Sequence, residues 1–376
     1  MKILFVDPYE TNILNFRKEL LDSLISAGHD VFLATNYSKT LANLYEKRVA
    51  FLWTNCDLRS KSIINNVSLY YKYKKIIKNG HFDLILSFTV KPNIYCAFHS
   101  KRTPIITNIT GLGMAFSGKG LISRLIKKMY KKAFKNVDCV FFQNQKGYDV
   151  FKESNIPINH FRIIPGSGVN TTKFTYVPFS CDSHAFSFLY ASRFIKEKGI
   201  GLLLEAIPTI IEKHNKTVFV FVGDGEHQYV QTIEEYVEKW PNNNMYYKWT
   251  NNMTALYRES TFLISPSFYN EGISNVLLES LATGRPIITT EDNPGCMELL
   301  NNNKNGIGIK SNDLKSLLLG IEKACSLSCE EIKQMGLSGR KFVVEHFNRK
   351  QTINIYLSEM EKLVVLNSSK EEIKWK

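Results

Sequence analysis

Residues 261–282, TFLISPSFYNEGISNVLLESLA, join an apolar strand to an apolar-periodic helix through a polar loop. The strand-like run stops at Pro266, and Ser274 is a suitable N-cap for the helix that follows. Backbone amides at such a helix start favour a phosphate. Glu271 in the loop can reach sugar hydroxyls, and Glu279 inside the helix can accept hydrogen bonds from a ribose. The stretch therefore predicts a β-α unit with a donor-sugar site at its turn.

The same alternation of short apolar strands and longer amphipathic stretches occurs in both halves of the chain, which predicts two parallel-sheet α/β domains. Strands are expected at residues 2–6, 30–34, 84–88, 104–108, 139–143 and 162–164, and at 186–191, 217–222, 245–249, 262–265 and 286–289. Helices are expected at 15–27, 120–134 and 349–363, among others. The predicted division is an N-terminal domain at 1–168, a linker at 169–185, a second domain at 186–348, and a C-terminal helix and tail at 349–376.

Composition favours a soluble globular protein that is too long for a single core, since the chain has 376 residues, 44% hydrophobic and 22% charged. The start, Met1 to Asp7, is too short an apolar run for a signal sequence, and no run of about 18 apolar residues occurs. A cytoplasmic protein without a transmembrane span is therefore expected.

The net charge of +13 is concentrated in the first half, where 16 Lys or Arg and a single acid lie between Asp57 and Asp138. Residues 119–135 predict an amphipathic helix with one strongly basic face. Such a face suits anionic lipid headgroups, although a surface helix whose lysines only solubilise it has the same pattern. No recognisable nucleic-acid-binding module accompanies the charge, so nucleic acid is not an expected partner.

The spacing of Glu271 and Glu279 resembles the E-x(7)-E motif of the family 4 glycosyltransferases. Residues 282–290, ATGRPIITT, and 293–298, NPGCME, also resemble that family, in particular its bacterial O-antigen and capsular polysaccharide members. The resemblance implies the GT-B fold, in which two Rossmann-like domains face each other across a cleft and a C-terminal helix crosses back to the first domain.

The resemblance also implies a donor site in the second half of the chain. Arg193 and Lys198 follow the strand at 186–191 and match the family's phosphate-binding cations. The chain has no D-x-D motif, so these cations and helix-end amides are expected to neutralise the leaving diphosphate without a metal or other cofactor. The predicted catalytic residue is Glu271. The predicted donor-binding residues are Arg193, Lys198, Gly223, Gly225, Gly272, Ile273, Ser274, Asn275 and Glu279.

Two segments of the first half, 89–95 and 108–116, resemble acceptor-side loops of bacterial polysaccharide glycosyltransferases. The predicted acceptor-side residues are Lys91, Asn108, Thr110, Gly111 and Gly113, and Lys91 is placed to meet a lipid-linked pyrophosphate. The chain departs from the family in two ways. The second loop lacks the histidine or acid that many members have, and residues 7–17 replace the usual Gly-Gly after the first strand.

The implied reaction is the retaining, metal-independent transfer of a hexose or N-acetylhexosamine from a nucleotide diphosphate sugar, UDP being the favoured nucleotide. The implied acceptor is a glycan on undecaprenyl pyrophosphate in O-antigen or capsule assembly. The enzyme is expected to be cytoplasmic and to bind peripherally at the inner face of the cytoplasmic membrane. Two alternatives stay open: a sugar-nucleotide epimerase of the same fold, and a noncatalytic basic protein that docks on membranes or nucleic acid.

Overall fold

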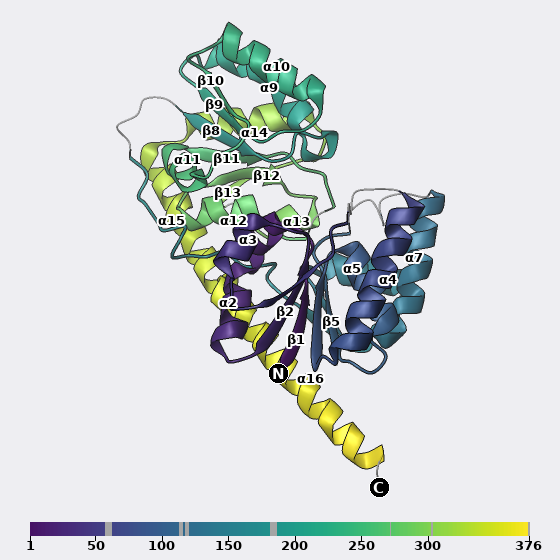
Figure 1. Ribbon diagram of the computed structural model, residues 1–376. Helices are drawn as coiled ribbons and strands as arrows, with labels where there is room; N and C mark the ends of the chain where they lie inside the picture. The colour runs from purple at the N-terminus through teal and green to yellow at the C-terminus, as the bar shows by residue number, and fades with distance from the viewer. Residues whose placement is uncertain are drawn as a thin grey trace. The chain divides into compact units, whose positions relative to one another are not determined.

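The computed structural model describes residues 1–56, 62–112, 116, 120–180, 186–270, 272–301 and 304–374. The chain forms two compact units (Figure 1). The first unit comprises Met1–Ser167 together with Lys350–Lys376, and the second comprises Gly168–Arg349. Each contains one parallel sheet with helices packed on it, as the alternating sequence pattern predicts.

The first unit has a seven-stranded sheet in the order β3-β2-β1-β4-β5-β6-β7. Its strands are β1 (Lys2–Val6), β2 (Asp30–Thr35), β3 (Ala50–Trp53), β4 (Leu84–Phe88), β5 (Ile105–Ile109), β6 (Cys139–Phe142) and β7 (Phe161–Ile163). Every neighbouring pair is parallel. The strand order reverses between β1 and β4, and open parallel sheets bind ligands beyond the carboxyl ends of strands at such a point.

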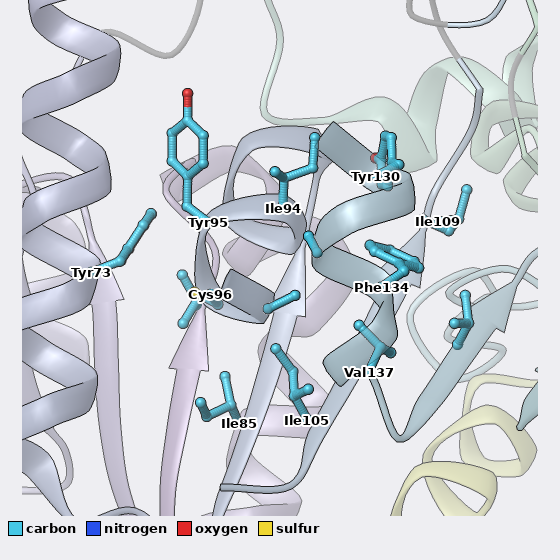
Figure 2. Close-up of a cluster of buried hydrophobic side chains, with 14 of the residues drawn as sticks. Tyr73, Ile85, Ile94, Tyr95, Cys96, Ile105, Ile109, Tyr130, Phe134 and Val137 are labelled. Atoms are coloured by element: carbon cyan, nitrogen blue, oxygen red, sulfur yellow. The ribbon is translucent and has the colours of Figure 1, made fainter. Parts of the chain in front are cut away.

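The helices of the first unit cover both faces of this sheet. They are α1 (Glu10–Asn12), a π-helical turn η1 (Ile13–Arg17), α2 (Lys18–Ser26), α3 (Lys39–Leu44), α4 (Ile63–Gly80), α5 (Val90–His99), α7 (Leu121–Ala133), the 3₁₀ turn η2 (Phe134–Asn136) and α8 (Gln145–Glu153). Figure 2 shows one core, in which Tyr73 of α4, Tyr95 of α5 and Tyr130 of α7 lie over Ile85 and Ile105 of the sheet. The inner faces of α4, α5 and α7 are thus buried in this core.

The second unit has a six-stranded parallel sheet in the order β10-β9-β8-β11-β12-β13. Its strands are β8 (Ser187–Ala191), β9 (Val218–Val222), β10 (Asn244–Tyr247), β11 (Phe262–Ser265), β12 (Ile287–Thr290) and β13 (Gly306–Ile309). Its helices are η3 (Lys196–Lys198, 3₁₀), α9 (Ile200–Lys213), α10 (His227–Lys239), α11 (Met253–Glu259), α12 (Asn275–Ala282), α13 (Pro294–Met297), α14 (Leu314–Ser326) and α15 (Cys329–His346). Here the order reverses between β8 and β11.

The C-terminal helix α16 (Arg349–Lys374) begins at the last residue of the second unit and continues in the first, which confirms that it crosses back. Buried Tyr356 packs its ring edge-on against Phe141, with the ring centroids 4.8 Å apart. Glu359 accepts hydrogen bonds from Arg162 at 2.8 Å and pairs with His160 at 2.7 Å. Among the described residues, no helix combines the length and apolar composition that a bilayer span requires.

The structure corrects the sequence prediction at three segments. Strands β3 and β13 were not predicted, and both lie at sheet edges. In β13 the two glycines weaken the strand signal, yet Gly306 is required because a Cβ there would meet Ile287 O at 2.4 Å. Residues 89–95 were predicted as a loop but enter α5 from Val90 onward.

Candidate active site

Two cations predicted to bind phosphate meet over one aromatic ring at the carboxyl edge of the second sheet. The Arg193 guanidinium lies 5.5 Å from the Tyr269 ring centroid, and Lys198 Nζ lies 5.2 Å from it. The cations follow β8 and the tyrosine follows β11, the two strands that flank the reversal of strand order. Cation–π contacts orient both side chains. Sequence reasoning missed Tyr269, although an aromatic residue two positions before Glu271 was visible.

The loops after β8 and β11 are fixed to each other through their backbones. Phe268 N donates to Glu197 O at 2.9 Å. Gly199, which ends the η3 turn, has φ +74°, and a Cβ there would lie 2.2 Å from Pro266 O. A side chain at this position is therefore excluded both by conformation and by space. This close approach holds Lys198 beside the loop that leads to Glu271.

The glycines of the turn after β9 are required by packing against the β8 loop. A Cβ on Gly223 would lie 1.9 Å from Ser192 O, and one on Gly225 would lie 2.2 Å from Phe194 O. Phe194 N also donates to Asp224 O at 2.9 Å. The sequence interpretation attributed these glycines to the approach of a ligand. The structure supplies a reason within the protein, and it places the turn next to Arg193.

Glu279 lies on α12 and is only partly exposed. Its Oε2 accepts a hydrogen bond of 2.9 Å from the hydroxyl of buried Tyr257 on α11. Among the described residues, no hydrogen bond reaches its other oxygen. Burial raises the pKa of Glu279 to about 6, against the opposing effects of the Tyr257 bond and of the charges on Lys173 and Arg349. A carboxylate held by one oxygen, with the other unused, suits a ribose hydroxyl; Tyr257 was not predicted.

Glu279→Gln is expected to stabilise the empty protein at pH 7.5 while weakening donor binding. Because the folded-state pKa is raised, the folded protein binds more protons between pH 4.5 and 6, so stability falls as pH rises through that window. The raised pKa of Glu279 lowers the free energy of unfolding above pH 6 by at most about 2 kcal/mol, and solvent screening reduces this figure. Losing a charged hydrogen bond to the donor should weaken its affinity about tenfold or more.

Thermal melts at pH 4 and pH 7.5, with and without UDP, check both effects of Glu279→Gln. The substitution should raise the Tm at pH 7.5 only, and it should shrink the shift that UDP produces. Tyr257→Phe is the matched variant, since it removes the internal hydrogen bond and leaves the carboxylate in place. A lower Tm for Glu279→Gln at pH 7.5 without UDP would show that the carboxylate serves the fold.

The start of α12 follows the sequence prediction in position but not in detail. Ser274 occupies the N-cap, yet its side chain makes no capping hydrogen bond. Its backbone N donates to Gly295 O at 3.2 Å. Gly272 and Ile273, which precede it, are buried, and Asn275 is the first helical residue. Glu271 lies outside the described residues.

The 293–298 motif supports the loop that precedes Glu271. Asn293 Nδ2 donates to Ser267 O at 2.8 Å and to Tyr269 O at 3.0 Å. Thr290 Oγ1 also donates to Ser267 O, at 2.7 Å. These buried side chains hold the backbone of Tyr269, so the motif acts on the site through the loop.

The predicted acceptor-side residues are placed near the carboxyl edge of the first sheet, with differing exposure. Lys91 lies in the first turn of α5, and Thr110 and Gly111 directly follow β5. Asn108 is 2% exposed; its Nδ2 donates to Ser87 O at 3.3 Å, and its Oδ1 accepts a hydrogen bond from Tyr356. Its side chain is thus engaged inside the unit. Gly113 lies outside the described residues.

A buried acid and a buried cation occupy the point where the strand order of the first sheet reverses. Asp7, 1% exposed, accepts hydrogen bonds at Oδ1 from Tyr9 N at 3.2 Å and Asn12 Nδ2 at 3.3 Å. Arg17, 5% exposed, lies 4.5 Å from the Phe88 ring centroid. Its guanidinium makes one hydrogen bond with the described residues, a long one of 3.5 Å to the neighbouring backbone carbonyl.

Three features mark the surroundings of this Asp7–Arg17 pair as more than packing. Burial raises the pKa of Asp7 to about 6, although the charge of Arg17 opposes the rise. Arg17 ends the π-helical turn η1, and such turns are frequent at functional sites. At the end of the neighbouring strand β4, Thr89 has φ +71°, a strained conformation for threonine. Both residues lie in the segment 7–17 that departs from the resemblance, and no role was predicted for either.

Comparison with known proteins assigns both units. A family model described as glycosyl transferases group 1 matches residues 182–342, and one described as glycosyl transferase 4-like matches residues 2–144. The chain is 22% identical over 338 residues to the N,N'-diacetylbacillosaminyl-diphospho-undecaprenol alpha-1,3-N-acetylgalactosaminyltransferase of Campylobacter jejuni, covering 84% of this chain and 87% of that one. It is 23% identical to the capsular polysaccharide biosynthesis glycosyltransferase CapM of Staphylococcus aureus, covering 77% of each.

The fold agrees with these matches. The structure of Anabaena HepE in complex with UDP superposes with a TM-score of 0.76 at 16% identity, covering 96% of this chain and 100% of that one. At that identity the superposition shows the fold alone, and the fold is GT-B. Together with the two family models, it establishes that this chain is an enzyme belonging to the family 4 glycosyltransferases.

Proposed function

We propose that this enzyme transfers a hexose or N-acetylhexosamine from a UDP-sugar to a lipid-linked glycan, with retention of configuration. The observation that carries the proposal is the cluster at the β8/β11 reversal. There, Arg193 and Lys198 share the ring of Tyr269, and the described residues bond only one carboxylate oxygen of Glu279. Two oriented cations suit a diphosphate, and the carboxylate suits a ribose.

The proposed reaction needs no strong general base. The bond between the anomeric carbon and the diphosphate oxygen breaks, and the acceptor oxygen bonds to that carbon on the same face of the sugar. The acceptor's proton passes to the departing diphosphate. Arg193 and Lys198 stabilise the negative charge that develops there, which is the work of a metal in other transferases. Glu271 steadies the sugar's hydroxyls, and Gly223, Gly225 and the start of α12 line the donor.

The acceptor is proposed to bind the first unit. The relative from Campylobacter jejuni carries diphospho-undecaprenol in its name, and CapM carries capsular polysaccharide. We extend the chemistry of both to this chain: a glycan on undecaprenyl diphosphate, used in surface polysaccharide synthesis at the inner face of the cytoplasmic membrane. Lys91, Thr110, Gly111 and Gly113 stay the predicted acceptor-side residues. The Asp7–Arg17 pair joins them because both side chains keep hydrogen-bonding atoms unused by the described residues.

Donor binding is tested by thermal stabilisation with UDP-, GDP- and ADP-sugars in the presence of EDTA, on the wild type and Glu279→Ala. We expect one nucleotide to raise the Tm selectively and the substitution to reduce that rise. A shift that EDTA abolishes would contradict metal independence. No shift with any donor would favour the noncatalytic alternative. Conversion of the donor to a second sugar nucleotide when no acceptor is present would favour an epimerase.

A further inference from the structure

The first turns of α7 expose apolar side chains that the core does not use. Leu121 is 82% exposed, Ile122 is 65% exposed and Leu125 is 58% exposed. The inner face of the same helix is filled, since Tyr130 and Ala133 are buried. The exposed residues are therefore a second apolar surface of α7, separate from the one that holds it on the sheet.

The first turns of α4 repeat this arrangement, which the sequence did not predict. Ile63 is 78% exposed, Ile64 is 79% exposed and Val67 is 48% exposed. Further along, Tyr73 and the other inward residues of α4 are buried against the sheet. Two helices thus each present three apolar side chains to solvent at the same end.

Both ends lie at the carboxyl edge of the first sheet. Helix α4 connects β3 to β4, and α7 lies between β5 and β6, all of which are parallel strands. A helix that crosses between parallel strands runs against the strand direction, so it begins at the carboxyl edge. Helix α5 packs against both α4 and α7 on one side of the sheet (Figure 1). Thr89 and Gly111 lie at this same edge.

The charged side chains of α4 and α7 are all positive. Neither α4 nor α7 contains an acidic residue. The basic residues lie among and after the apolar turns: Lys74, Lys75 and Lys78 on α4, and Arg124, Lys127, Lys128, Lys131 and Lys132 on α7. Lys72 of α4 instead donates to the backbone carbonyl of Thr54. Apolar side chains at the tip with cations behind them match the layers of an anionic bilayer, whose headgroups lie above the acyl chains. A second copy of the same surface would instead bring cations against cations.

We propose that the first unit docks on an anionic phospholipid bilayer through Ile63, Ile64 and Val67 of α4 together with Leu121, Ile122 and Leu125 of α7. These six residues form the docking surface. The inference rests on the proposed function in one respect: the docked edge is the edge that carries the predicted acceptor-side residues. Docking there brings a lipid-linked acceptor's diphosphate to that edge without the lipid leaving the membrane.

Co-sedimentation with vesicles tests the docking surface on the full chain. The wild type should bind vesicles of phosphatidylglycerol and phosphatidylethanolamine, bind phosphatidylcholine vesicles weakly, and lose binding at high salt. A variant with all six residues changed to Ser should bind the anionic vesicles at least about tenfold more weakly than the wild type. The matched control is Leu319→Ser with Leu337→Ser, because these leucines of the second unit are 56% and 49% exposed.

The outcomes separate docking from the proposed reaction. Equal binding by the six-residue variant and the control, or binding that ignores lipid charge and salt, overturns the docking surface. A wild-type dimer that the six-residue variant loses also overturns it, since the surface then joins two copies. Stabilisation by UDP is measured on the same samples. Its retention in the six-residue variant shows a folded protein, and its absence from the wild type contradicts the proposed donor while leaving the docking result to stand.

Discussion

Replacing both Arg193 and Lys198 by Ala is expected to lower kcat by about 10² or more, the scale found for removing electrostatic partners of a transition state. Both cations lie within 6 Å of the Tyr269 ring centroid, so they are presented together at the β8/β11 reversal. The diphosphate gains charge as the glycosidic bond breaks, and these cations interact with it most strongly at that moment. The loss should therefore fall on kcat more than on KM.

The matched control for this double variant is Lys196→Ala. Lys196 lies in the same η3 turn as Lys198 and is exposed, but it makes no contact with Tyr269 among the described interactions. Its removal should leave kcat within about twofold, since an exposed cation outside the site is screened by solvent. Steady-state measurement of kcat and KM for both variants tests this prediction. Equal kcat values for the double variant and Lys196→Ala would remove these cations from the mechanism.

Much of the fold could be predicted because buried parallel strands are continuous apolar runs. The bounds of β1, β4 and β11 match the prediction residue for residue. The edge strands β3 and β13 carry weaker signals, since part of an edge strand's stability comes from packing that the sequence does not show. The prediction of a loop at residues 89–95 rested on a resemblance to acceptor-side loops and was wrong from Val90 onward; Pro92 lies in the first turn of α5, where proline is tolerated.

The site residues were predicted from two kinds of sequence signal, a position directly after a strand and a motif spacing. Arg193 and Lys198 were predicted from the first signal, and Glu271 and Glu279 from the second. Tyr269 and Tyr257 were missed because their roles arise from contacts between separate elements. The ring of Tyr269 contacts two cations that belong to another loop. The hydroxyl of Tyr257 on α11 donates a hydrogen bond to the carboxylate of Glu279 on α12. Pairings of this kind depend on how the strands are ordered in the sheet, and no local sequence pattern encodes that order.

Glu271→Ala is expected to lower kcat by about 10² or more while leaving UDP binding nearly unchanged. The loop that leads to Glu271 is held from both sides. Asn293 binds the backbone carbonyls of Ser267 and Tyr269, and Ser274 N donates to Gly295 O just before α12. Because the described residues on either side of position 271 are held in place, we expect the Glu271 carboxylate to act on the sugar's hydroxyls as the anomeric carbon becomes cationic. That interaction strengthens in the transition state and contributes little to binding the nucleotide.

The control for Glu271→Ala is Glu291→Ala, an exposed acid that follows β12 at the same edge of the sheet. Both variants should keep the wild-type Tm shift with UDP, which shows that the donor site is intact. Only Glu271→Ala should then lose turnover, with KM for the donor little changed. Near-normal kcat for Glu271→Ala would refute its catalytic role. A lost UDP shift would instead assign Glu271 to nucleotide binding, so the two measurements separate a residue that acts on the reacting sugar from one that holds the leaving group.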